Sequence, residues 1–287
     1  MRTLLKRHPL DAYFSVAFLI SWGAGLVVEG PRLMRGQPIS AENTLMLFPV
    51  LVVGVGLAGL ALTALVDGRA GVCDLFARMG RWRVGAGWWA AALFIAPALI
   101  LLTLLALRTF VSPAFASGFF PLGLVFGLVP GLFEEVGWTG FAYPRLMRQR
   151  SPLAAAVLLG VLWGLWHLPV VDYLGAAAPH GAAWLPVFGA FVLLVAGMRV
   201  LIEWVYLHTR SLLLAQLMHA SSTACLVLFG APGVSPAQEA LWYAIYGLVL
   251  WTCVALVVRA EGPSLVGQRA APRGGAAASQ QSSPQQP

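Results

Sequence analysis

Three apolar stretches of the sequence each carry a side chain that can exchange a proton with water near neutral pH. Glu134 and Glu135 close the uncharged run "GLVFGLVPGLF", His167 lies in "GVLWGLWHLPV", and His219 lies in "LLLAQLMHASSTACL". Ionisable groups at membrane depth are costly and usually functional. Their convergence on one cavity is the simplest interpretation, because such a set can activate water and stabilise an oxyanion. The same set can also bind zinc or relay protons.

The two acids are adjacent, so on a helix their side chains point about 100° apart and cannot share one role. We expect one carboxylate to face a cavity and the other to be held by protein partners. The alternative is that Glu134 and Glu135 both cap the end of a span, solvated at the headgroup level.

Each histidine also has a purely structural interpretation. His167 follows Trp163 by four residues on one helical face. It can be a satisfied packing residue as well as a catalyst. His219 has Ser222 and Thr223 three and four residues further on, and this polar stripe can be a seam of hydrogen bonds between helices.

The composition predicts what kind of protein carries these groups. Of the 287 residues, 59% are hydrophobic and 10% are charged, and the mean hydropathy is +0.81. Soluble domains are nearer ~25% charged, so the sequence predicts an integral membrane protein in the lipid bilayer. The net charge of +7 lies mainly in short loops between apolar stretches, which argues against nucleic acid as a partner.

The apolar stretches predict an all-α membrane protein with about eight transmembrane helices in one bundle. The expected spans are 12–28, 44–66, 86–107, 116–133, 152–171, 184–206, 211–230 and 238–258. The sixth ends near Arg199 and Glu203, which lie four residues apart and can pair. We expect a transmembrane domain over 1–260, with a core at about 116–230. A disordered tail rich in Gly, Pro, Ser and Gln is expected over 261–287.

Basic residues predict the orientation and the compartment. With the N-terminus inside, fifteen of the eighteen arginine and lysine residues fall in inner segments. This asymmetry predicts a multi-pass protein of the cell membrane with both termini in the cytoplasm. The richness in arginine, alanine and glycine indicates a bacterial source.

The polar motifs resemble those of the CPBP family, the CAAX-protease and bacteriocin-processing membrane proteins related to CAAX prenyl protease 2. The family pattern has E-E-x-x-x-R, aromatic-x-x-x-H and H-x-x-x-N motifs on successive helices. The matching segments here are Glu134–Thr139, Trp163–His167 and His219–Thr223, in the same order, within about residues 116–230.

The resemblance implies a glutamate-dependent intramembrane endopeptidase. Glu134 would be the general base that activates water, and His167 would orient that water and share its proton. His219 would stabilise the tetrahedral oxyanion, with Thr223 beside it. Glu135 would be structural, and Trp163 is the aromatic residue of the second motif.

Two positions depart from the family pattern. Thr139 stands where the pattern has arginine, so Glu135 loses its expected cation, and Arg145 or Arg148 is the nearest substitute along the chain. Thr223 stands where the pattern has asparagine and offers one hydroxyl donor. These departures leave the survival of activity open.

Several functions therefore remain. The leading hypothesis is hydrolysis of a peptide or membrane-protein substrate near the cytoplasmic leaflet, without a cofactor. A zinc-dependent variant would use Glu134, His167 and His219 as ligands. A weakened enzyme, or a non-enzymatic scaffold or bacteriocin-immunity protein of the same family, fits the two threonines. A proton-coupled transporter is the weakest alternative, because no internal repeat is visible. The oligomeric state is not predicted.

Overall fold

The computed structural model describes residues 2–35, 37, 41–168 and 180–267 of the chain. Every regular element among these residues is helical, so the prediction of an all-helical protein is confirmed. Of the predicted tail, residues 261–267 are described, and Leu265 is fully buried, so the packed chain continues past Ala260. Residues 268–287 lie outside the described residues.

A helix occupies each of the eight predicted spans. These helices are α2 (Pro9–Leu33), α3 (Ala41–Val66), α5 (Ala86–Phe110), α6 (Gly123–Gly137), α8 (Pro152–Trp166), α10 (Trp184–Thr209), α11 (Leu212–Leu228) and α12 (Pro236–Glu261). The shorter helices are α1 (Arg2–Arg7), α4 (Gly68–Met79) and α7 (Tyr143–Leu146). Single turns are η1 (Pro113–Phe115), η4 (Gly181–Ala183) and η5 (Gly262–Ser264), and η2 (Trp138–Ala142) is a π-helix.

The number of membrane-crossing helices is smaller by the criterion of length. Among the described residues, five helices are long and apolar enough to cross a membrane, namely α2, α3, α5, α10 and α12. Helices α8 and α11 are apolar but shorter, and α6 has 15 residues with two carboxylates. The chain is therefore a multi-pass membrane protein, while the count of eight spans is not confirmed.

The fourth predicted span is wrong at its start. Helix α6 begins at Gly123 instead of residue 116, because the preceding segment runs alongside the end of α11. The N–H groups of Gly118 and Phe120 donate to the carbonyl oxygens of Gly230 and Leu228, each at 2.9 Å. These contacts satisfy backbone groups that would otherwise need a helix. Helix α6 then continues through both glutamates to Gly137.

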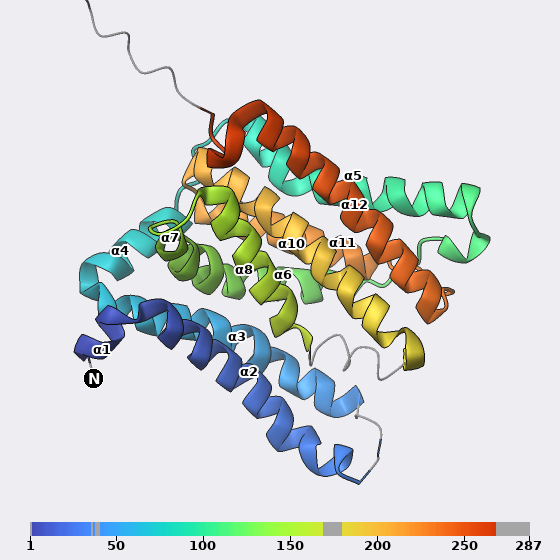
Figure 1. Cartoon of the computed structure of the whole chain (residues 1–287), viewed down its shortest axis with the longest axis horizontal. Helices are drawn as coiled ribbons and strands as arrows, with labels where there is room; N and C mark the ends of the chain where they lie inside the picture. The colour runs from blue at the N-terminus through green and yellow to red at the C-terminus, as the bar shows by residue number, and fades with distance from the viewer. Residues whose placement is uncertain (1, 36, 38–40, 169–179, 268–287) are drawn as a thin grey trace, which may run out of the picture.

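The helices form one bundle, with α6, α8, α10 and α11 in its middle (Figure 1). Helix α6 packs against α11 and α3, and α10 packs against α8 and α12. Helices α2 and α3 lie on one side of the bundle, and α5 and α12 lie on the other (Figure 1). The motif-bearing helices α6, α8 and α11 are thus covered by neighbours.

Glycines on one face of α6 allow a close approach to α11. Gly123, Gly127 and Gly131 recur every four residues, and a Cβ added at any of them would lie within 2.6 Å of the α11 backbone. Small residues at this spacing let membrane helices pack backbone to backbone. This contact fixes the distance between the helix that bears the glutamates and the helix that bears His219.

Replacing Gly127 with alanine is expected to destabilise the bundle by about 1–3 kcal/mol, because overpacking forces backbone shifts. The added Cβ would lie 2.3 Å from the backbone nitrogen of Ala224. The apparent Tm of the purified protein in detergent measures the effect. Gly189→Ala is the matched control, since a Cβ there meets nothing within 4 Å. Equal Tm values for the two variants would contradict the close contact.

Candidate functional site

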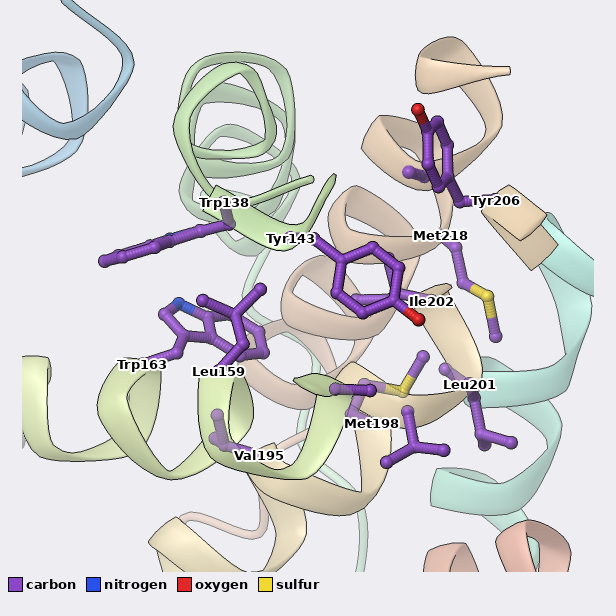
Figure 2. Packing of buried hydrophobic residues seen from close by; sticks show 14 of the residues in the cluster. Trp138, Tyr143, Leu159, Trp163, Val195, Met198, Leu201, Ile202, Tyr206 and Met218 are labelled. Atoms are coloured by element: carbon purple, nitrogen blue, oxygen red, sulfur yellow. The ribbon is translucent and has the colours of Figure 1, made fainter. Parts of the chain in front are cut away.

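Glu134 is a buried carboxylate with one occupied and one unoccupied oxygen. It lies in the last turn of α6 and is 1% exposed. Its Oε2 accepts hydrogen bonds from the indole Nε1 of Trp138 at 3.0 Å and of Trp163 at 2.9 Å. Both indoles lie in the packed core (Figure 2). The two donors fix the carboxylate without neutralising it.

The chain changes its helical form directly after the glutamates. Residues Trp138–Ala142 form the π-helix η2, which continues from α6 into α7. π-helical turns are rare and occur frequently at functional sites. At the start of this turn, the Trp138 side chain reaches back to Glu134, and the Thr139 hydroxyl reaches back to Glu135.

Glu135 is fully buried and has four hydrogen-bond donors. Arg199 makes a bidentate pair with it, Nη1 to Oε2 and Nη2 to Oε1, each at 2.8 Å. The Nδ1 of His219 lies 2.7 Å from Oε1, and the Thr139 hydroxyl donates to Oε2. Bidentate, charge-assisted bonds are the strong ones. Two adjacent acids therefore have separate environments, as the sequence predicts.

The partner of Glu135 comes from a different helix than expected. Arg199 lies on α10, whereas the candidates from the sequence were Arg145 and Arg148. Arg145 instead pairs with Asp67, its Nη2 2.5 Å from Oδ2, and donates to the carbonyl oxygen of Phe141 at 2.8 Å. Arg145 lies ten residues beyond Glu135 along the chain, and its side chain joins α7 to the residue after α3. It is therefore not the cation that holds Glu135.

His167 stands at the C-cap of α8 instead of inside a longer span. Its Nδ1 lies 2.7 Å from the carbonyl oxygen of Trp163. A carbonyl only accepts, so Nδ1 carries the proton, and Nε2 of the neutral ring is an acceptor. The ring lies edge-on to Trp163, Trp166 and Phe191, with centroids 5.4, 4.8 and 5.2 Å away. The histidine is thus fixed with one defined free nitrogen.

Trp163 joins both halves of the site. Its indole donates to Glu134, and its ring lies 5.4 Å from the His167 ring and 4.8 Å from the His219 ring, centroid to centroid. The Arg199 guanidinium carbon lies 4.3 Å from its centroid, a cation–π distance. One side chain therefore contacts all three of the acid–base residues that the sequence placed on separate helices.

Three reactive atoms in this cluster remain unoccupied. Glu134 Oε1, His167 Nε2 and His219 Nε2 form no hydrogen bond with the described residues. None of them is among the fully enclosed side-chain atoms that lack a partner, so each keeps some accessible surface. These atoms are free to meet a water molecule or a peptide group.

Thr223 is less closely joined to the site. It lies one turn beyond His219 on α11 and is half-buried. Within the described part of the chain, it forms no hydrogen bond with Glu134, His167 or His219. Its role beside His219 stays a prediction.

Sequence reasoning missed Trp138 and the role of Arg199. Both carried a signal. Arg199 is an arginine inside an apolar span, and a buried guanidinium needs a carboxylate as its partner. Glu135 was the carboxylate whose expected cation was missing at position 139. The predicted pair of Arg199 with Glu203 also exists, with Nη1 3.4 Å from Oε1. Trp138 follows Glu134 by four residues, so the two share one helical face.

A metal site would need three ligands in one place. Among the residues that the structure describes, no group of three His, Cys, Asp or Glu side chains is placed to hold a metal ion. His219 is oriented through Nδ1 towards Glu135, which leaves only Nε2 for another partner. Independence of a cofactor stays a prediction.

Comparisons with known proteins identify similar sequences. Residues 116–225 match the family described as Type II CAAX prenyl endopeptidase Rce1-like. The chain is also 32% identical over 111 residues to a protein of Methanococcus maripaludis named CAAX prenyl protease 2, over 37% of this chain and 40% of that relative. The chain thus spans about two fifths of the length of this curated relative. The segment that carries all three motifs is thus similar to the Rce1-like family of CAAX proteases.

Proposed function

We propose that the chain is an intramembrane endopeptidase that uses Glu134 as its general base. One observation carries the proposal. The Glu134 carboxylate is held through one oxygen by two indoles, and its other oxygen forms no hydrogen bond with the described residues. One of these indoles, Trp163, also contacts both histidine rings. A general base must be rigid, proton-accepting and within reach of its water, and this arrangement meets the first two requirements.

The first step is the activation of water. Glu134 Oε1 takes a proton from a water molecule, whose oxygen attacks the carbonyl carbon of the scissile peptide. His167 Nε2, the free acceptor of its ring, accepts the second hydrogen bond from that water and orients it. The proton then passes to the leaving amine.

The second step is stabilisation of the oxyanion. His219 is held through Nδ1 by the Glu135 carboxylate, which complements positive charge on the ring as negative charge develops on the substrate. For this step the ring would be doubly protonated before the attack, so that Nδ1–H donates to Glu135 and Nε2–H donates to the tetrahedral oxygen, where a placed donor contributes most. The hydroxyl of Thr223 is the second proposed donor.

The substrate we propose is a peptide or a membrane-protein segment, cleaved near the cytoplasmic leaflet. The positive-inside asymmetry supports this location, because the Arg145, Arg148 and Arg150 side of the site faces inwards by that rule. The relative is named a CAAX prenyl protease, so a prenylated C-terminal peptide is one candidate. A bacteriocin-like leader or a membrane-protein tail is the other.

Cleavage by the purified protein tests the proposal. The probes are an internally quenched peptide ending in a farnesylated C-a-a-X sequence and an unprenylated membrane-anchored peptide, both in lipid vesicles. We expect cleavage of at least one probe. We expect this cleavage to persist in chelator-treated protein that metal analysis shows to be free of zinc. Loss of activity on chelation and its return with zinc would favour the zinc-dependent variant.

The same assay separates the enzyme from a scaffold or immunity protein. Glu134→Ala is expected to abolish cleavage while the protein still folds. Unchanged proteolysis by this variant would exclude Glu134 as the base. A full cellular phenotype with both Glu134→Ala and His167→Ala would favour the non-enzymatic function.

A further inference from the structure

We propose that Arg199 is the positioning residue that replaces, from another helix, the arginine missing at position 139. This inference rests on the proposed function. The family motif places its cation four residues after the second glutamate, where this chain has Thr139. In the structure, a guanidinium nevertheless pairs with Glu135. It belongs to Arg199 on α10, sixty residues after position 139.

The position of Thr139 explains why the exchange is possible. Its hydroxyl contacts Glu135 Oε2 and Glu203 Oε1, the latter at 2.9 Å. Arg199 Nη1 donates to the Thr139 hydroxyl oxygen at 3.3 Å. A longer side chain at position 139 would therefore point towards Glu135 and Glu203, the two carboxylates to which Arg199 donates. An arginine at position 139 or at position 199 could therefore place its guanidinium beside Glu135.

The charges of the buried side chains also agree with Arg199 as the cation that pairs with Glu135. Arg199, Glu135 and Glu203 are fully buried. Thr139 has one hydroxyl proton and can donate it to only one carboxylate at a time. When it donates to Glu135, the contact with Glu203 requires a proton on Glu203. These three side chains then have one cation and one anion, so no charge among them is left uncompensated.

Arg199 acts on the reacting residues through two contacts. Through Glu135 it holds the carboxylate that orients His219. Through the face of Trp163 it supports the indole that donates to Glu134. Removing the guanidinium would release both the Glu135–His219 pair and the Trp163 indole that donates to Glu134.

An exchange of the cation between the two helices tests the proposal. Arg199→Met is expected to lower kcat by about 10- to 100-fold, as for other supporting partners of catalytic side chains, with KM little changed. Adding Thr139→Arg in that background is expected to restore kcat at least tenfold. Thr139→Leu with Arg199→Met is the matched control, which fills the space without a charge and is expected not to restore it.

Two results would overturn the inference. One is a kcat of Arg199→Met within about twofold of the unmodified protein, well inside the loss expected of a supporting residue. The other is a folded Thr139→Arg, Arg199→Met protein no more active than Arg199→Met alone. If Arg199→Met does not fold, the double variant must recover the folded yield and apparent Tm where the leucine control does not.

The Tm measurement also separates this inference from the proposed function. A protein that cleaves neither probe would contradict the proposed function, and the recovery of Tm by Thr139→Arg would still decide the pairing. A recovery of Tm without recovery of kcat would assign Arg199 to stability alone and reject its positioning role.

Discussion

Replacing Glu134 with glutamine is expected to lower kcat for peptide cleavage by as much as ~10⁴-fold, the upper range for loss of a general base. The amide keeps an oxygen that can accept from Trp138 and Trp163, at the positions where Oε2 now accepts at 3.0 and 2.9 Å. It cannot take a proton from water at neutral pH. Single-turnover cleavage of the quenched peptide measures the loss.

Glu239→Gln is the matched control for this variant. Glu239 is another helix-borne glutamate near the start of α12, and its Oε2 lies 3.1 Å from His180 Nε2. We expect its kcat to equal that of the unmodified protein. If Glu134→Gln kept more than about a tenth of the activity, a loss too small for removal of a general base, Glu134 would not be the base.

The second large effect is expected at the oxyanion. His219→Gln is expected to lower kcat by about 10²- to 10³-fold, as for other oxyanion donors, and to leave KM nearly unchanged. The reason is that His219 Nε2 would bond only an oxygen that becomes negative in the transition state. Glutamine can still donate to Glu135, so the pair of Glu135 with Arg199 is kept.

His208→Gln controls for the removal of a histidine bonded to a glutamate. His208 Nε2 lies 2.7 Å from Glu261 Oε2, the same distance as between His219 and Glu135. Its kcat should not change. A rise in KM at constant kcat for His219→Gln would assign His219 to substrate binding and remove it from the oxyanion.

The fold was predictable because hydropathy has a direct physical cause. A bilayer accepts only backbone that satisfies its own hydrogen bonds, so long apolar runs must be helical. The edges depend on tertiary contacts that hydropathy does not contain. The segment before Gly123 is apolar enough for a helix, yet Gly118 and Phe120 pair with the end of α11. The π-helix after Glu135 likewise has no signal in hydropathy.

The site was predictable in its residue types and not in its partners. Glu134, His167 and His219 were recognisable because ionisable groups stand out in apolar helices. The partner of Glu135 was not, because proximity along the chain favoured Arg145 while the fold brings Arg199. The two indole hydrogen bonds to Glu134 Oε2 come from Trp138 and Trp163, which the fold brings together from separate helices. Spacing along the sequence does not show such a contact.

Glu203 has a consequence for how such a site can change during evolution. Losing an arginine at position 139 before gaining one at 199 would leave Glu135 buried without a cation, a step that costs about 3–5 kcal/mol. A chain with both arginines avoids that step, provided a second acid balances the second cation. Glu203, whose Oε2 has no described partner, is that acid. With Glu203 present, a sequence with arginine at both positions would therefore keep each buried cation paired with a carboxylate.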